Sequence, residues 1–306
     1  MTRLGSSDLD VSPLCLGGNV FGWTADEEHS FAVMDAFVAA GGNFIDTADS
    51  YSAWVPGNSG GESETIIGRW MAQRGNRDSL IVATKVGHDR NLRRDVILDR
   101  AKRSLERLQT DHIDLYYMHN DDPDTPFEES LGAFGELVAD GSVRWIGASN
   151  FAGERLAEAL DVAEREGLPR IVAIQNEYNL VARAYENGPR EVAAARGVAA
   201  IPYYGLASGF LTGKYRPDGA AVDSPRAPSA LAKLDASGVA VLEVLDAVAQ
   251  AHATSQAAVA LAWLASRPTV VAPIASARTV EQLDELLAFM TLELGADELE
   301  RLTRAG

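Results

Sequence analysis

The sequence predicts an α/β fold, a (β/α)8 TIM barrel that forms a single domain over residues 1–306. Eight short, apolar, β-branched runs recur along the chain, and stretches with helical spacing separate them. Runs this apolar have no face suited to water, which is typical of parallel strands covered by helices. Eight strands close such a barrel, and about 250 residues plus insertions fit the length of the chain. A doubly wound open sheet is the alternative.

The individual elements follow from the apolar pattern. Ile97, Ala101, Ser104 and Leu108 recur at helical spacing and predict one of the outer helices. We also expect an N-terminal β-hairpin over residues 2–12, a long loop over 205–237 after the seventh strand, and a last helix over 296–302. Within the loop, prolines and a glycine predict that 216–230 is a mobile lid without an element of its own. The eight predicted strands are 14–16, 44–46, 80–84, 113–117, 143–146, 171–174, 198–202 and 269–274.

Composition excludes several classes of protein. Asp and Glu number 44 against 27 Lys and Arg, which gives a formal net charge of −17. A surface this negative repels phosphate backbones and anionic lipids, so we expect neither a nucleic-acid nor a membrane partner. The only cysteine, Cys15, lies in an apolar stretch and is expected to be buried. With no disulfide pair and no apolar targeting segment at the N-terminus, the sequence favours a cytoplasmic protein. It leaves the oligomeric state open.

Common nucleotide and metal motifs do not match. The chain has no Gly-x-Gly-x-x-Gly, which argues against a Rossmann dinucleotide site. The segment from Gly209 to Tyr215 resembles a P-loop but is one residue short and lacks the Ser or Thr that would hold magnesium. The histidines show no metal-binding spacing, and no metal site is expected.

Polar side chains instead follow three consecutive predicted strands. Asp46, Lys85 and His119 end these strands, and Tyr51 lies on the loop after the first of them. In a (β/α)8 barrel the carboxyl ends of the strands meet at one rim, where active sites are found. Each residue alone has a structural explanation, such as an ion pair or a core hydrogen bond. Their convergence at one rim favours a catalytic role.

The chemistry that suits these groups is proton transfer. A tyrosine titrates near 10, too high for efficient acid–base catalysis at neutral pH, and a nearby ammonium is expected to lower that value. In this interpretation Asp46 keeps Lys85 charged, and Lys85 lowers the pKa of Tyr51. His119 donates a hydrogen bond to a substrate carbonyl. A Schiff-base lysine is the competing use of Lys85, but it requires a neutral amine, which Asp46 opposes.

Several segments together resemble the aldo-keto reductase family along nearly the whole chain. The resemblance implies a barrel that reduces aldehydes or ketones to alcohols with a nicotinamide cofactor, with Asp46, Tyr51, Lys85 and His119 as the catalytic tetrad and Tyr51 as general acid. The matching segments include Phe44-Ile-Asp-Thr-Ala, Ala83-Thr-Lys85, Asp114-Leu-Tyr-Tyr-Met-His119, Ile146-Gly-Ala-Ser-Asn150, Gln175-Asn-Glu-Tyr-Asn179 and Gly209-Phe-Leu-Thr-Gly-Lys-Tyr215.

The resemblance also implies the cofactor contacts. Ser149, Asn150 and Gln175 match residues that bind the carboxamide, and Tyr203 matches the aromatic residue under the nicotinamide. Ser276 and Arg278 match the stretch that meets the adenosine 2′-phosphate, which favours NADPH over NADH. The remaining positions carried over to the cofactor are Gly18, Asn19, Asp46, Tyr204, Gly205, Leu206, Ser208, Gly209, Lys214, Gln282 and Glu285.

Three positions depart from the family pattern. Tyr204-Gly205 replaces the usual Ser-Pro, Leu286 replaces an Asn that often follows Glu285, and Asn120 replaces a bulky aromatic residue. We expect Trp23, Trp54 and Asn120 to contact a small carbonyl substrate, with the aromatic walls favouring an apolar or ring-shaped one. Because the resemblance extends to channel-associated β subunits, a nucleotide-binding regulatory subunit with little turnover is the alternative function.

Overall fold

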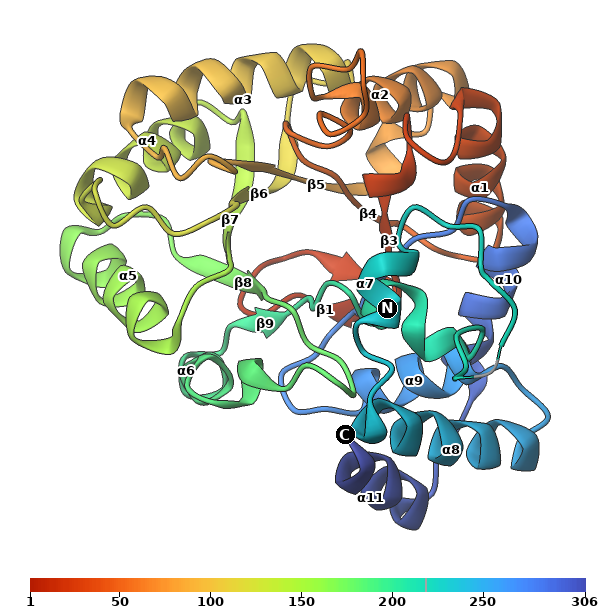
Figure 1. Ribbon diagram of the computed structural model, residues 1–306. Helices are drawn as coiled ribbons and strands as arrows, with labels where there is room; N and C mark the ends of the chain where they lie inside the picture. Colours follow the sequence, from red (N-terminus) through yellow and green to blue (C-terminus); the bar gives the residue numbers. More distant parts are fainter. Residues whose placement is uncertain (218) are drawn as a thin grey trace.

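Eight short parallel strands form a ring with helices around it in the computed structural model of the chain (Figure 1). The structure describes residues 1–217 and 219–306. Neighbouring strands pair in parallel in the order β10-β3-β4-β5-β6-β7-β8-β9. They are β3 (Cys15–Gly17), β4 (Phe44–Asp46), β5 (Ile81–Val86), β6 (Ile113–Met118), β7 (Val143–Ser149), β8 (Ile171–Gln175), β9 (Ala199–Ala200) and β10 (Ile274–Ala275).

Backbone hydrogen bonds between β9 and the segment that leads into β10 close the ring. Ala200 N donates to Thr269 O at 2.8 Å, and Val271 N donates to Ala200 O at 3.0 Å. Ile274 N donates to Pro202 O at 2.9 Å. An open doubly wound sheet would leave both outer strands unpaired along this line, so the predicted (β/α)8 barrel is confirmed.

Helices cover the outside of the ring, and several of them begin or end at capping residues. The Asp26 side chain accepts a hydrogen bond from His29 N at the start of α1, and Gly75 and Gly167 end α2 and α5 in the left-handed conformation. The helices are α1 (Glu27–Ala39), α2 (Glu62–Arg74), α3 (Arg94–Leu108), α4 (Phe127–Ala139), α5 (Gly153–Glu166), α6 (Pro189–Arg196), α7 (Ala227–Leu231), α8 (Ala236–Ala251), α9 (Gln256–Ala265), α10 (Val280–Leu287) and α11 (Ala296–Ala305). Short 3-10 turns occupy η1 (Gly18–Val20), η2 (Arg77–Ser79), η3 (Ala184–Glu186), η4 (Ala207–Thr212) and η5 (Ala288–Thr291).

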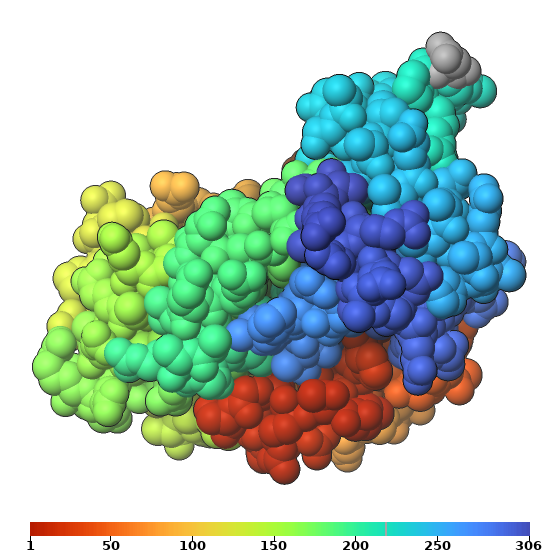
Figure 2. All heavy atoms as spheres, turned by 90° about the horizontal axis from the view of Figure 1, so that it is seen from below, coloured from red at the N-terminus to blue at the C-terminus, as the bar shows by residue number. Residues whose placement is uncertain are grey.

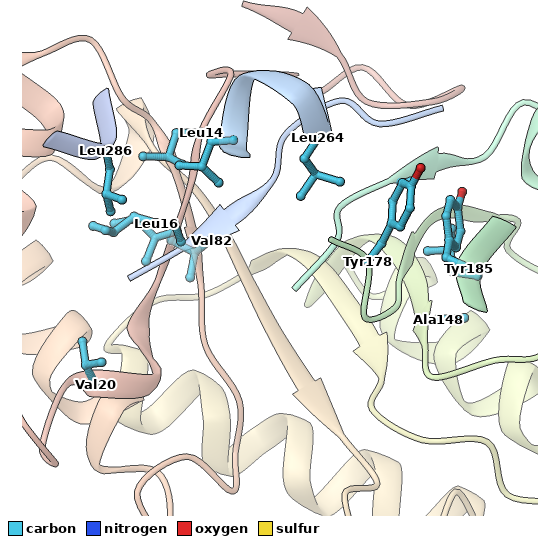
Figure 3. Packing of buried hydrophobic residues seen from close by; sticks show 14 of the residues in the cluster. Leu14, Leu16, Val20, Val82, Ala148, Tyr178, Tyr185, Leu264 and Leu286 are labelled. Carbon is cyan, nitrogen blue, oxygen red and sulfur yellow. The ribbon is translucent and has the colours of Figure 1, made fainter. Parts of the chain in front are cut away.

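The core has two layers, because the side chains of each strand point alternately into the barrel and out toward the helices. Cys15, Phe44 and Leu115 belong to the inner layer, and the thiol of Cys15 is buried as expected. Leu16 and Val82 belong to the outer layer (Figure 3). The four predicted residues of α3 are also buried on this side.

The N-terminal hairpin (red) and residues 219–237 after β9 (cyan) lie at opposite ends of the barrel (Figure 2). Strands β1 (Thr2–Arg3) and β2 (Asp10–Val11) pair antiparallel and confirm the predicted hairpin. The hairpin side chains Leu4, Leu9 and Val11 are buried in the inner core layer, so the hairpin closes the amino-terminal end of the barrel.

The predicted lid differs from expectation. Residues 216–230 were expected to have no element, but α7 begins at Ala227 inside this segment. Pro228 lies in the first turn of α7, where a proline is tolerated because its missing N–H would have no partner in the helix. Residue 218 of the segment lies outside the described residues. None of the described helices is both long enough and apolar enough to span a membrane.

Candidate active site

The polar residues predicted at the strand ends meet at one end of the barrel. Asp46 ends β4, Lys85 is next to the last residue of β5, and His119 directly follows β6. Ser149 and Gln175 end β7 and β8. Since the strands are parallel and neighbouring, their ends bring these five side chains to the same rim.

Lys85 is the centre of the hydrogen-bond network. Its Nζ donates to Asp46 Oδ2 at 2.6 Å, to the Thr47 carbonyl at 2.7 Å and to Tyr51 Oη at 2.9 Å. An ammonium group has three donors, so all of them are used. The side chains of Lys85 and Asp46 are only 1% and 2% exposed. The positive charge is therefore fixed next to the Tyr51 hydroxyl.

Asp46 contacts a second strand end as well. Its Oδ1 accepts a hydrogen bond from Gln175 Nε2 at 2.9 Å, while its Oδ2 accepts from Lys85. Asp46 and Lys85 thus form a close, buried ion pair. Schiff-base chemistry, which needs the neutral amine, is opposed by this arrangement.

The pKa of Tyr51 differs from expectation. Burial, followed by the charge of Asp46, raises it well above its usual range, so the net lowering expected from the neighbouring Lys85 is wrong for this structure. The sequence showed the neighbouring ammonium but not the degree to which the phenol leaves water. Tyr51 is consequently protonated at neutral pH, and its hydroxyl lies 3.4 Å from Asp46 Oδ2. A protonated phenol at this place can serve as a proton donor.

His119 lies beside Tyr51 and is neutral. The two rings have centroids 6.1 Å apart in an edge-on arrangement. Burial, and then the charges of Lys85 and His88, lower the pKa of His119 to about 2. Its Nδ1 is buried without a hydrogen-bond partner among the described residues. A neutral imidazole can give a hydrogen bond to a carbonyl oxygen, but it is a poor source of a full proton.

A pocket with a volume of about 640 Å³ opens over this network. Trp23, Trp54 and Asn120 line it, as do all the residues that the family resemblance assigns to the cofactor except Gly18. Gly18 lies behind the wall, where its carbonyl accepts a hydrogen bond from Ser63 Oγ at 2.8 Å. Lys85 is not a lining residue, and it is connected to the pocket through its hydrogen bond to Tyr51.

One part of the pocket presents uncharged hydrogen-bonding groups. Ser149 Oγ donates to the Gln175 carbonyl, and Asn150 Nδ2 donates to Ser149 Oγ and to the His119 carbonyl. Tyr203 Oη donates to Asn150 Oδ1 at 2.8 Å. These bonds fix amide and hydroxyl groups next to Asp46, an environment that suits an amide-bearing ring.

Another part of the pocket is positively charged. Lys214, Arg226 and Arg278 line it together. Burial lowers the pKa of Lys214, and the charges of Arg278 and then Arg226 act in the same direction. No described carboxylate forms an ion pair with Lys214, Arg226 or Arg278. Cations that line the same pocket and repel one another favour an anionic ligand such as a phosphate.

Sequence reasoning missed Arg226. Its guanidinium carbon lies 5.3 Å from the centre of the Trp23 ring, and its Nη2 is buried with no hydrogen-bond partner among the described residues. The residue precedes α7 in the segment that was expected to form a lid, and nothing in the local sequence shows which residue of that segment faces the pocket. His88, which also lines the pocket, was missed too, although it lies two residues after the carboxyl end of β5, where the strand-end pattern could have found it.

Aromatic rings form the mouth of the pocket. Trp23 and Trp54 meet edge to face with centroids 5.5 Å apart, and Trp54 lies 6.0 Å from Tyr51. Trp54 remains 50% exposed, so a large apolar surface is open to solvent beside Tyr51. The mouth therefore suits flat or apolar ligands.

Comparison with known proteins identifies the family. The sequence model of the Aldo/keto reductase family matches residues 13–306. This chain belongs to the aldo/keto reductase family. It is 36% identical over 313 residues to the uncharacterized oxidoreductase YrpG of Bacillus subtilis, with 98% of this chain and 94% of the relative covered. It is 34% identical to the protein tas of Escherichia coli, with 98% and 95% covered. It is 31% identical to norsolorinic acid reductase of Aspergillus flavus, with 98% and 79% covered.

Membership in the aldo/keto reductase family confirms two expectations from the sequence, the family itself and an NAD(P)H-dependent oxidoreductase as the class of enzyme. The three departures from the family pattern all lie in the pocket. Tyr204 has a φ of 54°, and its carbonyl accepts a hydrogen bond from Asn179 Nδ2. Leu286 is 5% exposed and adds an apolar group to the wall. Asn120 Nδ2 donates to the His88 carbonyl at 2.8 Å, which fixes the loop after β5.

Proposed function

We propose that the protein reduces an aldehyde or ketone to the alcohol with NADPH, and that Tyr51 is the general acid. The observation that carries the proposal is the pair of hydrogen bonds from Lys85 Nζ to Asp46 and to Tyr51. Together they hold a charged donor against a protonated phenol at the floor of a pocket. The family supports carbonyl reduction in general.

The residues of the pocket fit a nicotinamide dinucleotide phosphate. Ser149, Asn150 and Gln175 would hold the carboxamide, and Tyr203 would lie under the nicotinamide ring. Lys214 would contact the phosphates and Arg278 the 2′-phosphate of the adenosine. The absence of an ion pair between these cations and any described carboxylate, together with the unpartnered Nη2 of Arg226, supports an anionic ligand here. When bound, this cofactor supplies a hydride to the carbonyl carbon.

The chain itself supplies and controls a proton. His119 donates a hydrogen bond to the substrate carbonyl oxygen and thereby orients it toward Tyr51. Tyr51 gives its proton to that oxygen as negative charge develops there. The phenolate that remains is stabilised by the Lys85 ammonium 2.9 Å away, and Asp46 keeps that ammonium charged and in place. Tyr51 is protonated before the substrate arrives, and the stabilisation of its phenolate by Lys85 offsets the weak acidity that its high pKa implies.

The mouth of the pocket favours substrates with a ring or another apolar body. Trp23 and Trp54 offer aromatic faces and edges, and Asn120 leaves room where a bulky aromatic residue is frequent in the family. One group of relatives is named norsolorinic acid reductase. An aromatic aldehyde is therefore the first substrate to test.

A panel of carbonyl compounds, assayed with NADPH and NADH in parallel, tests the proposal. We expect oxidation of NADPH with aromatic aldehydes and weaker activity with NADH. Tight binding of NADPH without turnover across the panel would instead support a nucleotide-binding regulatory subunit. An adduct trapped on Lys85 by borohydride would support Schiff-base chemistry.

A further inference from the structure

A carboxylate that the proposed chemistry does not use lies behind the pocket. The side chain of Asp49 is only 9% exposed, and its Oδ1 is buried without a hydrogen-bond partner among the described residues. Its Oδ2 lies 3.7 Å from Arg100 Nη1. Burying a carboxylate with only one oxygen near a positive charge lowers the stability of the folded protein, so the presence of Asp49 requires an explanation.

Charged or titratable groups from two helices, one loop and one strand surround Asp49. On α2, Glu64 is fully buried and accepts hydrogen bonds from Thr84 Oγ1 and Arg107 Nε, each at 2.6 Å. On α3, Arg100 and Arg107 provide positive charge. Asp89, on the loop after β5, forms two hydrogen bonds with Arg100, at 2.7 and 2.9 Å. On β6, Tyr116 has a buried hydroxyl without a partner among the described residues.

Asp49 belongs to the short loop between Asp46 and Tyr51. Its backbone N donates to the Lys85 carbonyl at 3.2 Å, and Tyr51 N donates to the Ala48 carbonyl at 3.2 Å. The loop is thus connected to the strand that carries Lys85 on one side and to the phenol on the other. Asp49 is therefore two residues from Tyr51, on a loop that backbone hydrogen bonds hold at both of these positions.

Arg100 connects this loop to a second one. Its guanidinium lies between Asp49 and Asp89, and Asp89 directly follows His88, which lines the pocket. When Asp49 is ionised, Arg100 attracts both loops toward α3. When Asp49 is protonated, Arg100 keeps only its bond to Asp89, because a neutral carboxyl loses most of the attraction.

We infer that Asp49 is a positioning residue for Tyr51, and that its ionised form, held by Arg100, sets the productive position of the loop that carries the phenol. The inference rests on the proposed reduction with Tyr51 as acid. Asp49 does not touch the substrate in this account. It acts through the loop and through Arg100.

The titration of Asp49 makes this role measurable. Burial, followed by the charge of Glu64, raises its pKa to about 6. The pKa of His119 is about 2 and that of Tyr51 is well above its usual range, so neither group changes charge between pH 5 and 8. We therefore expect kcat to rise with pH through about 6 because Asp49 ionises there.

The raised pKa also predicts that Asp49→Asn folds. The folded protein keeps the proton of Asp49 to a higher pH than an unfolded chain does, so ionisation lowers stability as the pH rises through about 6. A neutral amide removes this cost. The variant should unfold at the same denaturant concentration as the wild type at pH 7.5, or at a higher one.

The test compares kcat for benzaldehyde at saturating NADPH between pH 5 and 8. For the wild type we expect a rise on the order of fivefold, the factor for an ion pair of ordinary strength. Asp49→Asn should lack this rise and remain at the low-pH value of the wild type. Arg100→Gln should make the rise in kcat smaller as well.

Asp89→Asn is the matched control, because it removes the other partner of Arg100 and should keep the rise. His88→Gln should also keep it, which excludes a titrating imidazole as the cause.

Two results separate the inference from the proposed function. A wild-type enzyme that turns over but shows no rise near pH 6, or an Asp49→Asn variant that keeps the full rise, overturns the role of Asp49 alone. No turnover at any pH, with benzaldehyde or the rest of the panel, overturns the proposed function and this inference with it.

Discussion

At the scale of single residues, Arg278 allows a sharp test of cofactor choice. It lies in the pocket near Lys214, and its guanidinium forms no ion pair with any residue in the described part of the chain. We predict that Arg278→Met raises the Kd for NADPH by about tenfold or more, the loss expected for one charge-assisted hydrogen bond to phosphate. The Kd for NADH should stay unchanged, because NADH lacks the 2′-phosphate.

Fluorescence titration with the two cofactors measures this difference. Arg304→Met, which removes an exposed arginine of α11, is the control and should change neither Kd. Equal weakening of NADPH and NADH by Arg278→Met would assign Arg278 to a part of the ligand that both cofactors share.

Residues differ in how far the sequence predicts their roles. Asp46, Lys85 and His119 could be placed at one rim because each ends an apolar strand, and strand ends converge in a barrel. The roles of Arg226 and Asp49 could not be predicted in this way. Arg226 reaches the pocket through the path of a long loop, and Asp49 matters because of burial and of charges from α2 and α3. Such long-range contacts leave no local pattern.

At the scale of elements, a buried carboxylate holds the amino-terminal end of the barrel together. Asp114 of β6 has a side chain that is 1% exposed. Its oxygens accept hydrogen bonds from Arg77 Nη2 at 2.7 Å, from Val82 N at 2.9 Å and from Arg144 Nη1 at 2.7 Å. Arg144 also contacts Asp8 of the hairpin region at 3.1 Å. The network connects β5, β6 and β7 with the segment that closes the barrel.

We predict that Asp114→Asn lowers the free energy of unfolding by about 2–3 kcal/mol. The value lies below the usual cost of breaking a fully buried ion pair because both arginines reach solvent. Urea denaturation measures the loss. Asp8→Asn, which alters the exposed side of the network, should cost less than about 1 kcal/mol. Since the network lies at the end away from the pocket, kcat should not change, and a loss of kcat without a loss of stability would contradict this account.

Elements with a strong apolar pattern were predicted within a few residues, and those without it were not. All eight strands form where the apolar runs lie, although the last is seen only at Ile274–Ala275 instead of over 269–274. The preceding residues bond to β9 but include Thr269 at a φ of 71°, which interrupts an extended strand. Helix α7 was not predicted because the prolines of the segment 216–230 predict a loop, whereas its own proline, Pro228, is in the first turn, where a helix tolerates it.

At the scale of the whole molecule, charge and topology act together. The chain carries a net charge of −17, yet Lys214, Arg226 and Arg278 share one pocket at the carboxyl ends of the strands. Local positive charge in an acidic protein favours a small anionic ligand there and disfavours large polyanions elsewhere on the surface. The barrel brings this cationic region and the Lys85 network to the same end.

The central claim is that Tyr51 donates the proton in a reduction that this pocket carries out. The most direct test measures kcat for benzaldehyde with NADPH, together with the Kd of NADPH, for the wild type and for Tyr51→Phe. The substitution removes one oxygen and leaves the aromatic ring, so we predict a loss of kcat of at least about a hundredfold, as for other general acids, and an unchanged Kd. Equal values of kcat for the wild type and Tyr51→Phe would contradict the account.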